Sequence, residues 1–238
     1  MVQRPKIRNV AALGAGLLLF AGLLPAVISP QNSDNGSLED TFGRMKERLE
    51  AVQDYRCLYR SFAVRGPRRE EMVMKYFFKK PGWIRAEITE GKNKGTILIA
   101  REGKVRVQPD GILSVVHFTF KADSPRVTDI RGNKLEETSW HFFVEEHLKN
   151  IDLMELLSEG RDTLDGTDVL VIEIASRDPS RTRRIAREKL WISADGFILL
   201  QAEMYDTKER LVQHLRYADI LLNPGLPVDI SVDHSLAV

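Results

Sequence analysis

The side chains with the most obvious chemical potential are five histidines and one cysteine, spread over 238 residues. His141 and His147 are six residues apart, so a helix would place them on different faces and not around a shared metal ion. Cys57 has no patterned histidine or asparagine partner, and a single cysteine excludes a disulfide within the chain and every multi-cysteine metal site. The sequence also lacks the nucleophile elbow, the zincin motif and the phosphate-binding loop. We therefore expect no catalytic residues, no metal and no cofactor, and a binding protein in place of an enzyme.

A dense run of arginines between residues 177 and 187 is the second feature of this kind. One interpretation is a solvated turn beside a strand. The other is a patch of Arg181, Arg183, Arg184 and Arg187 that meets anionic head groups at a membrane, where each basic residue contributes about 1 kcal/mol. The whole chain has 35 Lys and Arg against 34 Asp and Glu, a net charge of +1, so no global field favours nucleic acid as a partner.

Large apolar side chains recur in the sequence and could either fill a core or line a cavity for a lipid. Unbranched methionine suits an adaptable apolar lining, and each buried methylene of an acyl chain contributes ~0.8 kcal/mol, so such a cavity needs little polar chemistry. The candidate cavity residues are Met72, Met74, Tyr76, Phe78, Trp83, Trp140 and Phe143.

The amino-terminal residues predict export. Residues 1–8 carry three basic residues and no acidic one, and residues 10–28 follow without a charge. A basic flank before an apolar stretch is typical of a secretory signal, and this stretch is also long enough to remain as a membrane anchor. The sequence leaves cleavage and retention open for residues 1–29. In either case we expect the rest of the chain to be periplasmic, either free or tethered to the inner membrane by residues 10–28.

Periodicity divides the exported part into two helices and a large sheet. After a polar linker at residues 30–37, Ser37 and Asp40 are spaced as a capping box that opens a helix with one apolar stripe. A second helix is predicted from about Trp140. Alternation with a period of two predicts strands at 55–66, 72–79, 83–88, 95–100, 104–108, 115–121, 169–175, 184–192, 197–205 and 211–221. We expect a domain over residues 38–230 and a short tail at 231–238.

An antiparallel sheet of this size twists strongly and tends to curl. The predicted fold is therefore α+β: a strongly curved antiparallel sheet, an incomplete β-barrel, with helices covering the concave face. Residues 109–135 are rich in Asp, Ser, Pro, Arg and Gly. A long irregular connection of this kind is usually functional.

Four segments together resemble the LolA-like superfamily of periplasmic lipoprotein carriers. They occur in the family's order, and they are 55–57 (YRC), 74–87 (MKYFFKKPGWIRAE), 190–200 (LWISADGFILL) and 217–226 (YADILLNPGL). The resemblance implies an open half-barrel that holds acyl chains under helical lids, with lipid or lipoprotein acyl chains as the partner. It also implies that Arg85 occupies the place of the arginine that ties the lids over the sheet. The alternative for Arg85 is a surface ion pair with Glu87 or a cross-strand acid.

The sequence thus favours an exported protein that binds a lipid or an acyl chain. The alternative function is an interaction or sensor domain that uses the same fold to bind an envelope protein without lipid cargo. An apolar cavity open to solvent would favour the first function, and a concave face filled by side chains would favour the second.

Overall fold

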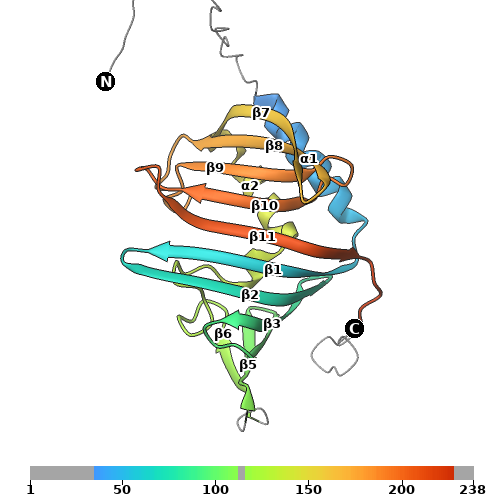
Figure 1. Ribbon diagram of the computed structural model, residues 1–238, viewed down its shortest axis with the longest axis vertical. Helices are drawn as coiled ribbons and strands as arrows, with labels where there is room; N and C mark the ends of the chain where they lie inside the picture. Colours follow the sequence, from blue (N-terminus) through green and yellow to red (C-terminus); the bar gives the residue numbers. More distant parts are fainter. Residues whose placement is uncertain (1–34, 112–115, 228–238) are drawn as a thin grey trace, which may run out of the picture. The chain divides into compact units, whose positions relative to one another are not determined.

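The computed structural model describes residues 35–111 and 116–227, and their dominant feature is one antiparallel sheet of eleven strands. Figure 1 shows these strands with two α-helices, α1 (Asn35–Glu50) and α2 (Trp140–Lys149). Two short 3-10 helices, η2 (Leu135–Thr138) and η3 (Ile151–Leu153), flank α2. The strands are β1 (Asp54–Arg65), β2 (Arg68–Lys79), β3 (Trp83–Gly91), β4 (Ile97–Arg101), β5 (Lys104–Gln108), β6 (Phe118–Lys121), β7 (Met154–Leu164), β8 (Thr167–Ser176), β9 (Arg187–Ser193), β10 (Leu199–Tyr205) and β11 (Leu211–Leu222).

The sheet consists of two meanders that meet at a seam between β1 and β11. The strand order is β6-β5-β4-β3-β2-β1-β11-β10-β9-β8-β7, so β6 and β7 are the edges and the sheet is not closed into a barrel. Across the seam, Tyr55 is opposite Leu222 and Ala63 is opposite Gln213. The predicted curved, antiparallel α+β architecture is therefore confirmed.

The seam is extended by the chain that follows β11. The Asp54 carboxylate accepts hydrogen bonds from the backbone N–H groups of Gly225 and Leu226, at 3.2 and 2.9 Å. The Asn223 side chain accepts one from the backbone of Gln53, 170 residues away, at 2.7 Å. The first and last strands are thus fastened by side chains as well as by their ladder.

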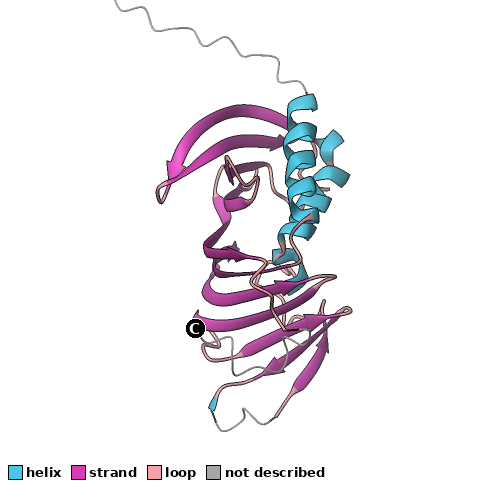
Figure 2. Cartoon of the chain, turned by 90° about the vertical axis from the view of Figure 1, so that its right-hand side faces the viewer, coloured by secondary structure: helices cyan, strands magenta, loops and turns pink. Residues whose placement is uncertain are grey.

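Both helices lie on one side of the sheet, which Figure 2 shows from the side. Because side chains alternate along a strand, every second residue of β2 faces these helices. Met74, Tyr76 and Phe78 therefore belong to the same buried cluster as Phe42 of α1 and Trp140 of α2. The helices and this face of the sheet enclose the main core.

Three buried tyrosines of the central strands hold the start of α2. The Tyr217 hydroxyl donates to the Thr138 carbonyl at 2.8 Å, and the Thr138 hydroxyl donates to Tyr76 at 3.2 Å. The Tyr55 hydroxyl accepts a hydrogen bond from the backbone N–H of Trp140 at 3.4 Å. The Tyr55 ring also stacks on the Trp140 ring, with 4.1 Å between centroids. Polar groups buried in this way need partners, so these contacts fix where the helix begins.

Some sequence-based boundaries differ from the structure. The first helix begins at Asn35, so Ser37 lies inside it and not at its cap, and the predicted linker at 30–37 ends earlier. Strand β7 was not predicted, because most of its residues are exposed and show no apolar alternation. Residues 1–29 and 231–238 lie outside the described residues. Within 35–111 and 116–227, the helices are too short or too polar to cross a membrane.

The tyrosine contacts generate a prediction about stability. Tyr217→Phe removes the hydroxyl that satisfies a buried carbonyl, and we expect it to lower the free energy of unfolding by about 1–2 kcal/mol. Urea denaturation followed by circular dichroism measures this. The control is Tyr205→Phe, which removes a hydroxyl bonded to the Glu203 side chain in a partly exposed position. Its cost should stay below about 0.5 kcal/mol. Equal losses in the two variants would show that Tyr217 does not anchor α2.

Candidate functional site

A cavity of about 430 Å³ lies between the concave face of the sheet and the segments that cover it. Its cover consists of residues 126–138, the cavity-facing side of α2 and the turn at 181–185. Both meanders contribute apolar side chains to its wall, from β2, β3, β4, β10 and β11. They are Met72, Met74, Ile88, Leu98, Met204 and Leu215. The concave face is therefore filled only in part by the core.

The cover adds apolar surface opposite the sheet. Leu135 of η2 and Phe143 of α2 are buried and also line the cavity. Phe142 lines it beside the Arg183 guanidinium, which lies 5.7 Å from the centre of the Phe142 ring. An apolar chain placed in the cavity would thus contact hydrocarbon on both sides.

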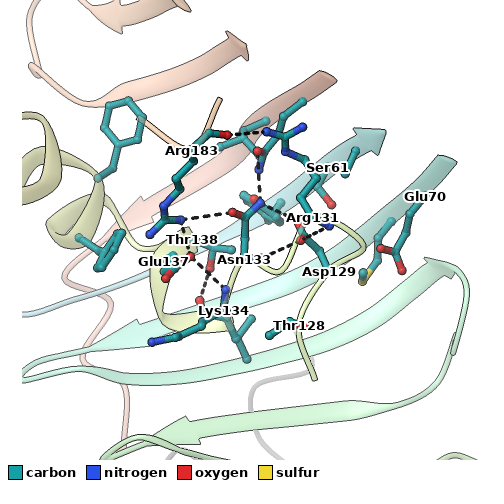
Figure 3. A pocket seen from close by; sticks show the side chains of 18 of the residues that line it. Ser61, Glu70, Thr128, Asp129, Arg131, Asn133, Lys134, Glu137, Thr138 and Arg183 are labelled. Atoms are coloured by element: carbon teal, nitrogen blue, oxygen red, sulfur yellow. Dashed lines mark hydrogen bonds and ion pairs between the residues drawn. The ribbon is translucent and has the colours of Figure 1, made fainter. Parts of the chain in front are cut away.

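The rim of the cavity is a network of polar side chains, drawn in Figure 3. Asp129 organises its loop: one carboxylate oxygen accepts the backbone N–H groups of Arg131 and Asn133, both at 2.8 Å. Its other oxygen accepts the Asn133 side chain at 2.7 Å. The Asn133 amide also donates to Gln213 of β11 at 3.2 Å, which ties the loop to the sheet.

Two arginines join this loop to other parts of the rim. Arg183 donates to Glu137 at 2.6 Å and to Asn133 at 3.2 Å. Arg131 donates to two carbonyls, those of Val64 at the end of β1 and of Arg183, each at 3.3 Å. The rim is therefore held by contacts between side chains and backbone of three separate segments.

A buried ion pair fastens α2 to β9 at the cavity wall. His147 is buried between aromatic rings: its ring centroid lies 4.7 Å from that of Phe42, which is stacked on it, and 4.1 Å from that of Phe143, which is tilted. Its Nδ1 lies 2.8 Å from the Phe143 carbonyl and its Nε2 lies 3.1 Å from a Glu188 carboxylate oxygen. With Glu188 ionised, both partners are acceptors, and the imidazolium form of His147 can donate to both of them. Burial lowers the pKa of His147, but Glu188, the Phe143 carbonyl and Glu146 together outweigh this effect and raise it overall.

The structure brings some of the predicted cavity residues together. Met72, Met74 and Phe143 line the cavity. Tyr76, Phe78 and Trp140 are on the same side of the sheet but are packed within the core, outside the cavity lining. Stacking of Phe78 and Trp140 on Tyr55 accounts for this packing.

Trp83 and Arg85 lie on the opposite face of the sheet, and this corrects their predicted roles. Strand alternation on β3 places Ile84 and Ala86 in the main core and turns Trp83 and Arg85 outward. Trp83 packs against Phe77 and Leu226 in a separate outer cluster, so it is not a cavity residue. Arg85 is buried on this face and pairs with Glu87 at 2.8 Å. The helices lie on the other face of the sheet, so this geometry does not support a latch between Arg85 and α2.

The arginine run is distributed over several contacts. Arg187 pairs with Glu173 and Glu209 on the outer face of the sheet. Arg183 and Arg181 instead line the cavity, and Arg184 is exposed. Arg187 therefore lies apart from the rim that Arg181 and Arg183 share, and a membrane patch of all four arginines stays a prediction.

Sequence reasoning missed several residues of the site. Met204 and Leu215 occupy predicted strands, but only the pairing of β10 with β11 shows that they share the cavity with Met74. The signal for the rim was the segment Asp129-Ile130-Arg131-Gly132, a turn motif inside the irregular connection. The pairing of His147 with Glu188 spans 41 residues and had no local signal.

Comparison with known proteins supports the fold. No family model and no curated protein sequence matches the chain. Among solved structures, the lipoprotein LppX of Mycobacterium tuberculosis aligns with a TM-score of 0.50 and 10% identity, over 82% of this chain and 100% of LppX. The chain therefore shares the fold of LppX. At this identity the likeness concerns the fold alone.

Two further structures are similar to this chain. A DUF1329 family protein from Desulfovibrio piger has a TM-score of 0.45 and 16% identity, over 86% of this chain and 99% of that one. A LolA superfamily protein from Nitrosomonas europaea has a TM-score of 0.41 and 13% identity, over 82% and 97%.

The buried ion pair generates a prediction about pH. Because the pKa of His147 is raised on folding, the pair stabilises the protein fully below the ordinary histidine value of about 6.5. This contribution is lost as the pH rises through the raised pKa. We therefore expect Glu188→Gln to destabilise the protein most at about pH 6 and less at about pH 9, measured by urea denaturation.

The control is Glu173→Gln, which breaks an ion pair with Arg187 on the outer face. Arginine does not titrate in this range, so the loss in the control should be the same at both pH values. A Glu188→Gln loss that is likewise independent of pH would contradict a charged His147.

Proposed function

We propose that this protein binds a lipid or an acyl chain in the cavity, as a non-enzymatic carrier of the cell envelope. The observation that carries the proposal is the cavity itself: about 430 Å³, lined by methionine, leucine, isoleucine and phenylalanine side chains from both meanders. This volume falls in the range of about 300–1,000 Å³ that is typical of small-molecule sites. Ten buried methylenes would contribute about 8 kcal/mol before the costs of association.

The chemistry beside the cavity supports binding over catalysis. His147 and Glu188 are bonded to each other, with 3.1 Å between Nε2 and a carboxylate oxygen, which supports a structural role for the pair. Burial raises the pKa of the Cys57 thiol, so the reactive thiolate is disfavoured. Among the described residues, His, Cys, Asp and Glu side chains do not gather into a group that could hold a metal.

A protein partner is the second candidate, and strand β7 favours it. This edge strand spans eleven residues, and its Leu157 side chain is 50% exposed. An exposed edge can pair with a strand of another chain. An interaction or sensor domain would use this edge, and the cavity would then be incidental.

The cavity wall generates a prediction that separates these functions. Met72→Glu places a carboxylate in the apolar wall at a partly exposed position, where the fold should tolerate it. We expect the affinity for the neutral probe N-phenyl-1-naphthylamine to fall at least ~tenfold, because the charge loses solvation when the probe fills the cavity. Fluorescence titration measures this.

The matched control is Leu221→Glu on the exposed part of β11, where the affinity should stay unchanged. Met72→Leu should also retain binding, since it conserves volume and apolar character. A parent protein that binds no apolar probe would favour the interaction domain instead.

The location has its own test. The basic and then apolar start of the chain predicts that residues 30–238 are exported. A reporter enzyme that is active only in the periplasm, fused after Val238, should therefore be active. A stable but inactive fusion would contradict the location without affecting the proposed cavity.

A further inference from the structure

We propose that the apolar chain bound in this cavity carries an anionic head group, which the guanidinium of Arg131 binds at the rim. This inference rests on the proposed function and names its ligand class: a single-chain amphiphile that ends in a carboxylate or a phosphate.

The carboxylates of the wall are each supplied with donors from the protein. Asp129 accepts three hydrogen bonds within its own loop. Glu137 accepts Arg183 at 2.6 Å and the backbone of Lys134 at 3.1 Å. Glu70 accepts the Ile130 N–H at 3.0 Å. Glu146 pairs with Lys149 and Glu188 with His147. These carboxylates already accept hydrogen bonds or form ion pairs within the protein, so a cationic ligand is not required to satisfy them.

The cations of the wall are supplied less well. In the described part of the chain, only Arg183 among the arginines and lysines of this wall has a carboxylate within 4.0 Å. The others are Arg126, Arg131, Lys134 and Arg181. The Arg126 guanidinium lies 5.5 Å from the centre of the Phe120 ring, which is a weak contact. The cavity wall therefore contains cations that are not paired with a carboxylate, and these cations favour an anionic ligand.

Arg131 is the best placed of these cations. It is half-buried, and its only acceptors in the described residues are the carbonyls of Val64 and Arg183, both at 3.3 Å. A guanidinium has five donors, so three remain in a planar array that suits a carboxylate or a phosphate. Burial lowers the pKa of Arg131; Asp129 and Asp206 oppose this effect, while Arg65 and Arg183 add to it. An anion here would relieve this unfavourable environment.

The position of Arg131 fits an amphiphile. Figure 3 shows its side chain extending over the rim toward the backbone of Arg183, among polar groups. The apolar wall of β2, β3, β4, β10 and β11 belongs to the same cavity. One end of a bound molecule can thus contact Arg131 while its chain contacts Met72, Met204 and Leu215.

The experiment compares two twelve-carbon ligands that differ in their head group, dodecanoate and 1-dodecanol, at pH 8. Each displaces N-phenyl-1-naphthylamine from the parent, from Arg131→Gln and from Arg131→Lys. We expect the parent to prefer dodecanoate. Arg131→Gln should lower the affinity for dodecanoate ~tenfold and change the affinity for dodecanol less than ~twofold, since only the charged head group loses its partner. Arg131→Lys should recover part of the dodecanoate affinity.

Matched arms identify the source of any effect. Arg161→Gln removes an exposed arginine on β7, away from the cavity, and should leave both affinities unchanged. Dodecyl phosphate should behave as dodecanoate does. Inorganic phosphate at the same concentration should not displace the probe, because the head without its chain lacks the apolar contacts.

Several outcomes overturn the inference. Equal affinities of the parent protein for dodecanoate and dodecanol would show that the protein does not recognise the charge of the head group. A loss of dodecanol affinity as large as that of dodecanoate in Arg131→Gln would show that Arg131 only positions the loop. In both cases the proposed function would stand. Failure of every twelve-carbon ligand to displace the probe would instead contradict the proposed function.

Discussion

The need to satisfy buried phenol hydroxyls at the centre of the sheet determines how this protein is built. Tyr55, Tyr76 and Tyr217 come from three adjacent strands and are fully buried. Their hydroxyl groups bond to residues 138–140, where α2 begins. The helix is thereby fixed over the middle of the concave face. One part of this face is packed against α1 and α2, and the part under residues 126–138 retains a cavity.

Most of the fold follows from patterns that are local in sequence. The alternation in β1 to β5 and in β8 to β11 reflects one buried and one solvated face, which sequence displays directly. Strand β7 was not predicted, because an edge strand with mostly exposed residues shows no contrast between a buried and a solvated face. Met72 and Met74 face the cavity, as the sequence predicted, but Trp83 does not. Trp83 follows a turn and is paired with Lys79 of β2, so it lies on the same face of the sheet as Lys79, opposite to Met74. Register is a property of pairing, and a single strand does not reveal it.

The site was less accessible to sequence reasoning than the fold. The cavity joins β2 to β10 and β11 through the seam, and the rim joins residues 129–137 to 181–185, so each depends on tertiary contacts. Arg85 shows the opposite difficulty. A resemblance assigned it a role, while its own strand faces it outward beside Glu87. Alternation along the strand was the better guide because it is a steric property of the backbone.

The seam between β1 and β11 also has a consequence for how the chain folds. Gln53 and Asn223, which are hydrogen-bonded across this junction, are 170 residues apart in the sequence. The strand pairing from Tyr55 to Ala63 likewise needs residues of β11 that are far away in the sequence. Closing so long a loop costs entropy before the contacts repay it, and topologies dominated by distant pairs fold slowly. Each meander is assembled from neighbouring hairpins and can form early. The central junction closes last, only after β11 has emerged, so the unfinished chain exposes two long strand edges during its synthesis and any translocation.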